Sequence, residues 1–221
     1  MHPEATMGVI TISRQQGSGG AEIAAQVCEL LGYRYFDKRL MAEAMAQENL
    51  TEETIIDYHE DEYRLVGFLD RLLGYRRPST IQDIGFWDKN PELVKTPAVA
   101  VLDEHLAVWV IRAAIKRAYA QGDVVIVGRA GQVVLANEPG VLHVRIEAPL
   151  EARIQRVVER SALDPKHARQ FVLERDKASA EYLQRFYGVD WSDPLLYHMV
   201  INTGKWSIAA AARCIASAVE L

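Results

Sequence analysis

The sequence lacks several features that would each indicate a particular class of protein. It has only two cysteines, so no disulfide framework is expected, and we interpret Cys28 and Cys214 as small core residues in a reducing compartment. No apolar run approaches the roughly 18 residues of a membrane span. Residues 1–7 are polar and contain no apolar segment typical of a secretory signal, so we expect a cytoplasmic protein.

A net positive charge and the residue spacing of a metal site are also missing. The formal net charge is −5, which does not favour general binding to nucleic acid. The six histidines are scattered, and no cluster of ligand-type residues has the spacing of a metal site, so we expect no metal held by protein side chains. The composition is ordinary for a globular protein, and the length predicts one large domain or a core with an insertion.

A glycine-rich stretch, residues 9–23, is the most informative part of the chain. A β-branched run enters a turn that contains Gly17, Gly19 and Gly20, and an apolar-periodic segment follows. The pattern predicts a strand, a glycine loop and a helix. This geometry points several backbone N–H groups and a helix N-terminus at one place, where an anion can bind. The alternative is a tight strand-to-helix turn that binds nothing.

The loop departs from the common phosphate-binding pattern G-x-x-x-x-G-K-[ST]. In that pattern the lysine contacts the β- and γ-phosphates, and the hydroxyl binds Mg²⁺. When Gly17 and Gly19 are aligned with its later glycines, Arg14 replaces the first glycine. Gly20 then replaces the lysine, and Ala21 replaces the hydroxyl residue. The backbone cradle is therefore expected without either of these side chains.

The rest of the chain alternates strand and helix patterns. Strands are expected at 8–13, 33–36, 123–128, 141–146 and 199–203, and helices at 20–32, 38–47, 98–121, 149–160, 164–187 and 206–220. Several of the strands are apolar without alternation, which is typical of parallel strands buried on both faces. The order predicts an α/β fold with a parallel sheet and helices on both faces. His143 is interpreted as a packed or exposed strand histidine, not as a ligand.

Two segments have a different character. Residues 48–70 contain eight Asp or Glu, and Arg64 is their only Arg or Lys. This is typical of a solvated helical face; a site for a cationic partner is the alternative. Residues 75–97 combine prolines and aromatics without a clear period, which indicates a structured loop or an interface. Self-association through Phe86, Trp87 and the prolines nearby, giving a homodimer, is one hypothesis for this segment.

Polar residues follow several of the expected strands at their C-terminal ends. They are residues 13–20, Arg129, and Asn202 with Thr203. In a parallel sheet these ends share one rim, where ligands bind. The planar fork of Arg129 suits a phosphate, and a surface salt bridge is the alternative. Asp37 follows strand 33–36 and either contacts a ligand or caps the next helix; these roles are compatible.

Three arginines, Arg153, Arg156 and Arg160, are spaced to share one helix face. Like charges on one face repel each other unless an anion lies close enough to neutralise them. A nucleotide triphosphate would do so, and so would Glu159 and Glu174. Phosphoryl transfer requires positive groups of this kind, because its transition state spreads charge over the equatorial oxygens. A plain solvated face is the alternative.

With these residues in hand, the chain resembles the cytidylate kinase-like family, P-loop proteins related to nucleoside monophosphate kinases, over about residues 8–216. The matching pieces are 12–20, 35–38, 125–129, 148–154, 187–191 with 193–194, and 201–203. The resemblance implies a three-layer P-loop NTPase fold of the nucleoside monophosphate kinase type. Its core would be 8–36 and 98–221 with a lid at about 155–180, and a helical nucleotide-binding insertion would occupy 37–97.

The resemblance also implies an activity. It is ATP-dependent phosphoryl transfer to a small acceptor, expected to be a nucleoside monophosphate such as CMP, with Mg²⁺ held mainly through phosphates and water. Its partners would be nucleotide substrates, with neither nucleic acid nor membrane involved. The alternative is a non-catalytic nucleotide-binding or regulatory protein with the same fold.

Site residues follow from the resemblance, position by position. The catalytic group would be Arg129, Arg153 and Arg156, to which we add Arg14 as a candidate from the loop itself. The ATP-binding group is Ser13, Gly17, Ser18, Gly19, Gly20, Ala21, Glu22, Asn202 and Thr203. The acceptor-binding group is Asp37, Arg129, Arg175 and Asp176.

This chain also departs from true cytidylate kinases. Ala130 stands where they carry an aspartate that helps to read cytosine, and Ser179 and Tyr182 fall near later charged positions of their lid. Relatives commonly carry arginine at the position of Ala21. Arg14 is the candidate to replace the missing lysine.

Overall fold

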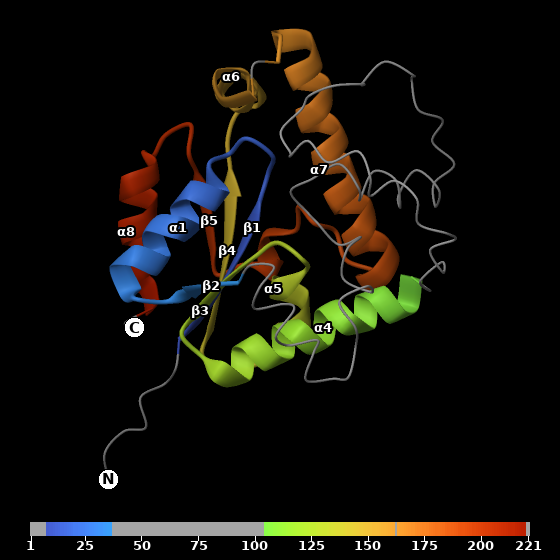
Figure 1. The fold of residues 1–221 in the computed structure, drawn as a ribbon, viewed down its shortest axis with the longest axis vertical. Coiled ribbons are helices and arrows are strands. Elements are labelled where there is room, and N and C mark those ends of the chain that lie inside the picture. Colours follow the sequence, from blue (N-terminus) through green and yellow to red (C-terminus); the bar gives the residue numbers. More distant parts are fainter. Residues whose placement is uncertain (1–7, 37–103, 162, 220–221) are drawn as a thin grey trace, which may run out of the picture.

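The computed structural model describes residues 8–36, 104–161 and 163–219, and a parallel sheet of five strands forms its centre (Figure 1). The strands are β1 (Val9–Arg14), β2 (Arg34–Tyr35), β3 (Val124–Val127), β4 (Val141–Glu147) and β5 (Met199–Asn202). Their order is β2-β3-β1-β4-β5, and each neighbouring pair is parallel. The predicted parallel α/β architecture is confirmed.

The helices lie close to their predicted bounds. They are α1 (Gly20–Leu31), α4 (Glu104–Gln121), α6 (Leu150–Ser161), α7 (Pro165–Tyr187) and α8 (Ile208–Val219). Two short elements were not predicted, α5 (Gly131–Val134) and the 3-10 helix η3 (Pro194–Leu196). The expected helix 38–47, the insertion 37–97, and the interpretations of Asp37, Phe86 and Trp87 fall outside the described residues.

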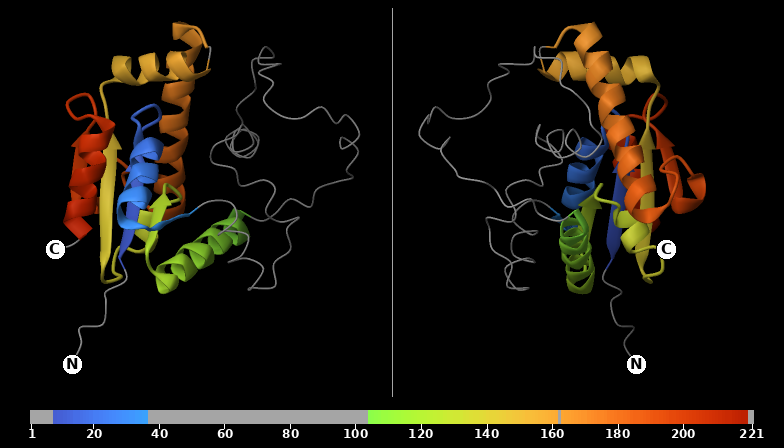
Figure 2. Two further views of the ribbon diagram at one scale, coloured as in Figure 1. Left: turned by 60° about the vertical axis from the view of Figure 1, so that its left-hand side comes forward. Right: turned by 90° about the vertical axis from the view of Figure 1, so that its right-hand side faces the viewer.

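The sheet lies between two helical layers because side chains alternate along each strand. Ile10 and Ile12 of β1 pack against α1 and α8, whereas Val9 packs against α4 and residues around α5. Figure 1 shows α1 and α8 on one side of the strands and α4 and α5 on the other, and Figure 2 gives two further views of the same arrangement. Helices therefore cover both faces, as the apolar strand patterns predict.

The connections place the glycine loop at a reversal of strand order. From β1 the chain runs through α1 to the edge strand β2, whereas the connection from β3 crosses to the far side of β1 and continues through β4 to β5. In open parallel sheets, ligands bind outside the carboxyl ends of the strands at such a reversal. Helix α6 lies over this rim of the sheet (Figure 1).

Local signals explain the bounds of two helices. The Asp164 carboxylate accepts hydrogen bonds from the N–H groups of Lys166 and His167, and Pro165 occupies the first helical position, so α7 begins where predicted. Gly32 ends α1 in the left-handed conformation. None of the described helices is long and apolar enough to cross a membrane.

His143 is a packed strand residue. Its ring is buried, Nδ1 lies 2.7 Å from the Thr11 hydroxyl oxygen, and the ring stacks on that of His198 with centroids 5.1 Å apart. Burial, with a smaller contribution from His198, lowers the pKa of His143 to about 4. The side chain is therefore neutral near pH 7 and serves packing, which agrees with its interpretation from the sequence.

Candidate functional site

The loop between β1 and α1 has a backbone that requires glycine. Gly17 and Gly19 have φ angles of +77° and +86°, in the left-handed region that other residues rarely adopt. A Cβ atom on Gly17 would lie 2.7 Å from the carbonyl oxygen of Arg153, and one on Gly19 would overlap Ile208. The glycines are therefore needed for conformation and for space.

The loop and the start of α1 present several backbone N–H groups together. The Ser18 N–H bonds to the carbonyl of Gln15, but within the described residues the N–H groups of Gly17 and of residues 19–21 have no hydrogen-bond acceptor. The buried Ser18 hydroxyl likewise has no partner in the described part of the chain. Amides at a helix N-terminus attract anions through their dipoles. The arrangement can hold phosphate oxygens.

Two arginines of α6 hold this loop by its carbonyl oxygens. Arg153 donates from Nη1 to the carbonyl of Gln16 at 3.1 Å and from Nε to that of Ala148 at 3.0 Å. Arg156 donates from Nη1 to the carbonyl of Gly17 at 3.3 Å. The structure thus places both guanidinium groups against the carbonyls of the loop, where they fix its shape.

Helix α7 also reaches the loop. The Gln16 N–H donates to Asp176 Oδ1 at 2.8 Å, and Asp176 Oδ2 lies 2.5 Å from Arg153 Nη1. The side chains of Arg153 and Asp176 are only 7% and 17% exposed. One carboxylate therefore joins α7, α6 and a loop amide.

The segment after β5 supports the loop from another side. The Thr203 hydroxyl donates to the carbonyl of Ser18 at 2.6 Å, and Arg156 donates to the same hydroxyl at 3.0 Å. Asn202 is exposed, and its side-chain oxygen accepts a hydrogen bond from the Gly204 N–H. Glu22, on the first turn of α1, pairs with Arg160. Thr203 thus bonds to the loop itself, and Glu22 links the start of α1 to α6. The Asn202 side chain bonds within its own turn.

The three arginines on the face of α6 find partners other than those the sequence suggested. Arg153 pairs with Asp176, Arg160 pairs with Glu22, and Arg156 bonds to oxygens of the loop and of Thr203. Glu159 instead accepts a hydrogen bond from Gln155, and Glu174 accepts one from Gln170. The shared face exists, and it is directed at the glycine loop.

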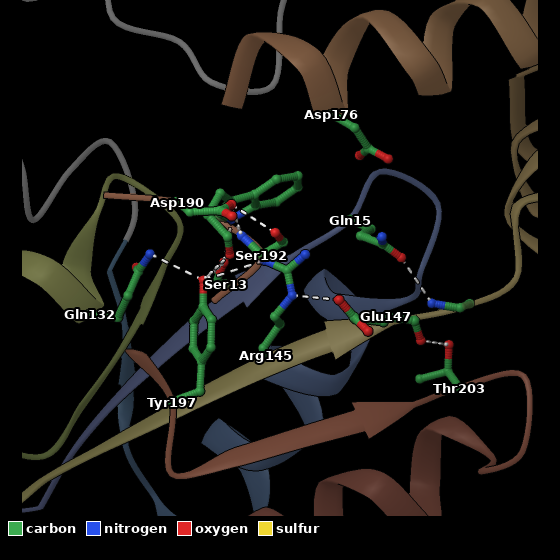
Figure 3. A network of polar contacts seen from close by, with 12 residues as sticks. Ser13, Gln15, Gln132, Arg145, Glu147, Asp176, Asp190, Ser192, Tyr197 and Thr203 are labelled. Atoms are coloured by element: carbon green, nitrogen blue, oxygen red, sulfur yellow. Dashed lines mark hydrogen bonds and ion pairs between the residues drawn. The ribbon is translucent and has the colours of Figure 1, made fainter. Parts of the chain in front are cut away.

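A buried polar network lies beside the loop, and sequence reasoning missed most of it. Arg145 of β4 is 2% exposed; it donates to the carbonyl of Trp191 at 2.6 Å and pairs with Glu147 at 2.5 Å. Figure 3 shows Arg145 extending between Glu147 and Tyr197. The sequence did contain a signal, because Arg145 lies within an apolar strand and a buried charge requires a polar partner.

Ser13 belongs to the same network. Its hydroxyl accepts a hydrogen bond from Trp191 Nε1 at 2.8 Å, and the Tyr197 hydroxyl lies 3.3 Å away (Figure 3). Ser13 is 2% exposed, so the structure places this predicted site residue beneath the loop. It anchors the segment that follows α7 to the end of β1.

Arg129 lies in a strained turn at the end of β3. Gly128, Arg129 and Ala130 have φ angles of +70°, +55° and +58°, and the left-handed conformation costs a residue with a side chain about 1–2 kcal/mol. Such strain concentrates at functional sites. The Arg129 guanidinium lies 5.5 Å from the ring centre of Phe36, which follows β2. The structure thus brings Arg129 to the rim of the sheet, beside the end of β2.

The other predicted arginines have distinct surroundings. Arg175 of α7 lies with its guanidinium 5.5 Å from the ring centre of Phe171. Arg14 ends β1, and its side chain lies against Gly20, the first residue of α1. Among the described residues, no group of three His, Cys, Asp or Glu side chains is placed to hold a metal ion.

Comparison with known proteins agrees with this geometry. The family model described as "Cytidylate kinase-like family" matches residues 9–205. A protein named cytidylate kinase from Methanopyrus kandleri is 35% identical over 100 residues, or 42% of this chain and 52% of that protein, so this chain spans about half the length of that relative. Another protein of that name, from Halobacterium salinarum, is 21% identical over 96% of this chain and 89% of its own length.

A solved structure shares the fold. It is that of an uncharacterized protein from Eubacterium ventriosum, with a TM-score of 0.60, 19% sequence identity, and coverage of 96% of this chain and 98% of that one. With the family match and the five-stranded parallel sheet, the predicted fold class of P-loop kinase type is confirmed.

Proposed function

This chain belongs to the cytidylate kinase-like family, and we propose that it is an ATP-dependent kinase acting on a small acceptor, a nucleoside monophosphate such as CMP. The observation that carries the proposal is the set of N–H groups at Gly17 and residues 19–21, which lie at the reversal of strand order. Phosphoryl transfer depends mainly on positioning and on charge stabilisation. A rigid set of amides directed at one place supplies both.

In this proposal the amides of the loop hold the phosphates of ATP. Arg153, Arg156 and Thr203 act as positioning residues, because they bond to loop carbonyls and fix the direction of the amides. Mg²⁺ would be held mainly through the phosphates of ATP and through water, as oxygen ligands suit this ion. When bound, Mg²⁺ would neutralise charge on the phosphates.

The acceptor would lie beyond the ends of β2 and β3. Arg129 is held there by a strained turn, and its planar, permanently charged fork suits an acceptor phosphate. Residues 37–97 would form the acceptor-binding insertion, beginning with Asp37. Residues 155–180, with Arg175 and Asp176, would form the lid. Because Ala130 replaces the aspartate that reads cytosine in true cytidylate kinases, the choice of base is open to test.

A second function has its own supporting observation. Residues 8–36 contain no lysine, and Gly20 and Ala21 provide no charged or hydroxyl group at the start of α1. A loop that binds phosphates without these groups suits a non-catalytic nucleotide-binding or regulatory protein. Nucleotide binding without transfer is the property that separates this function from the first.

The test is ADP formation from ATP and Mg²⁺ with a panel of nucleoside monophosphates and small metabolites, alongside calorimetric titration with an ATP analogue. A kinase forms ADP with at least one acceptor, and Arg129→Ala lowers kcat/KM by about 100-fold. The control, Arg213→Ala, removes an exposed arginine of α8 and leaves kcat/KM unchanged. Binding without ADP formation for any acceptor selects the second function, and the absence of binding rejects both.

A further inference from the structure

Residues 14 and 20 compete for the same space. A Cβ atom built on Gly20 would lie 2.5 Å from Cβ of Arg14, 2.9 Å from its Cγ and 3.6 Å from its Cδ. Carbon atoms that are not bonded to each other approach to about 3.5–4.0 Å. The structure therefore has room for a side chain at position 14 or at position 20, and not at both.

In the common phosphate-loop pattern, the side chain that fills this space comes from position 20 and not from position 14. In G-x-x-x-x-G-K-[ST], aligned on Gly17 and Gly19, the first glycine falls on position 14 and the lysine on position 20. Here the two are exchanged, because Arg14 carries the cation and Gly20 carries no side chain. The absence of a side chain at Gly20 therefore leaves the space that the Arg14 side chain occupies, so Gly20 is more than the loss of a lysine.

We infer that Arg14 performs the task of the P-loop lysine and contacts the phosphates that the loop holds, entering from the end of β1 and not from α1. This inference rests on the proposed function for the identity of the ligand, a nucleoside triphosphate. The side chain runs past the first residue of α1, and its guanidinium begins one bond beyond Cδ. The charge is thus carried to the helix end whose amides face the same ligand.

The electrostatics of this position favour a polyanion. The N-terminus of a helix carries partial positive charge, and the permanent charge of Arg14 adds to its attraction for an anion that lies close to both. A triphosphate is an anion of this kind. It also offers pairs of oxygens that match the guanidinium fork, which an ammonium group contacts only as a point charge.

The experiment separates the charge of Arg14 from the space that it fills. Arg14→Met keeps the unbranched stem and removes the charge, whereas Arg14→Lys keeps a charge. Gly20→Lys adds a second side chain to the same space, and the double variant Arg14→Gly/Gly20→Lys restores the common pattern. Arg213→Met, on the exposed face of α8, is the matched control. Each variant is titrated with inorganic tripolyphosphate, with an ATP analogue and with adenosine, and its thermal unfolding is recorded.

The expected results follow from the geometry. Arg14→Met weakens binding of tripolyphosphate and of the ATP analogue by about tenfold or more and leaves adenosine binding unchanged, while Arg14→Lys retains most of the affinity. Gly20→Lys lowers Tm by about 5 °C, and the double variant recovers both Tm and triphosphate affinity. Wild-type affinity in Arg14→Met, or wild-type Tm in Gly20→Lys, would overturn the inference.

These outcomes remain distinct from a failure of the proposed kinase. If the wild-type protein binds tripolyphosphate and phosphorylates no acceptor, the kinase proposal fails and the Arg14 comparison still decides the inference. If the wild-type protein is an active kinase and Arg14→Met has the same kcat/KM and affinity, the inference alone fails. If the wild-type protein binds neither tripolyphosphate nor the ATP analogue, both fail.

Discussion

The Asp176 carboxylate on α7 accepts a hydrogen bond of 2.8 Å from the backbone N–H of Gln16 in the glycine loop. The two residues are 160 positions apart in the chain. The same carboxylate pairs with Arg153, which in turn donates to the carbonyl of Gln16. The N–H and the carbonyl of one loop residue are thus both held by side chains from other helices.

The first prediction concerns this link. Asp176→Ala removes the ionic partner of a buried arginine, and we expect the free energy of unfolding to fall by about 2 kcal/mol. Glu174→Ala, two residues earlier on α7, is the control, because Glu174 is exposed and should change stability by less than about 0.5 kcal/mol. Urea denaturation measures both, and equal effects would show that the link does not stabilise the fold.

The second prediction separates space from conformation at a glycine. Gly17→Ala meets a positive φ and a carbonyl oxygen 2.7 Å from the new Cβ, whereas Gly32→Ala meets only a positive φ of +70° in open surroundings. Both variants bear the left-handed cost of about 1–2 kcal/mol, and Gly17→Ala should lose at least about 1 kcal/mol more. Denaturant titration gives both values. Similar losses would mean that the loop moves aside easily.

The third prediction concerns the anchor beneath the loop. Trp191→Phe removes the Nε1–H donor to Ser13 and should lower the free energy of unfolding by about 1–2 kcal/mol, because it leaves a buried hydroxyl with one fewer partner. Trp206→Phe is the control, since Trp206 is 47% exposed and should change stability by less than about 0.5 kcal/mol. If the two variants are equally stable, the indole hydrogen bond contributes nothing to stability.

The fourth prediction concerns pH. Folding lowers the pKa of His143 from 6.5 to about 4, so between these values the unfolded chain binds this proton more readily than the folded chain. The stability that depends on neutral His143 is complete above pH 6.5 and is lost as the pH falls toward 4. This one proton changes the free energy of unfolding by at most about 1.4 kcal/mol per pH unit.

Denaturation of the wild-type protein and of His143→Gln between pH 7.5 and 4.5 tests this slope. The variant keeps a polar side chain near Thr11 and cannot titrate, so its stability should fall less steeply as the medium becomes acidic. Parallel curves for the two proteins would show that other groups carry the acid sensitivity.

The sequence predicted the elements well where local chemistry determines them. Asp164 and Pro165 specify the start of α7, and Gly32 specifies the end of α1, because caps act within a few residues. The buried strands were visible as apolar runs. The order of the strands was not predicted, since it depends on pairings between residues more than a hundred positions apart, such as Val9 with Val124.

Side-chain roles at the site were less predictable. The sequence placed Arg153 and Arg156 near phosphates, but it could not show that they bond to loop carbonyls contributed by residues more than 130 positions away. Ser13 looked like a ligand contact because it ends a strand, yet Trp191 covers it. These outcomes depend on which side chain reaches a given polar atom, and that is fixed only by tertiary packing.

The overlap between positions 14 and 20 also constrains how such a loop evolves. Side chains at both positions overfill the space, so a side chain gained at one position lowers stability while the other position is occupied. A lineage that exchanges one arrangement for the other passes either through this less stable form or through glycine at both positions, a form that keeps the backbone and has no cation at either. The two sites are therefore epistatic, and each glycine is neutral or damaging only in relation to the residue six positions away.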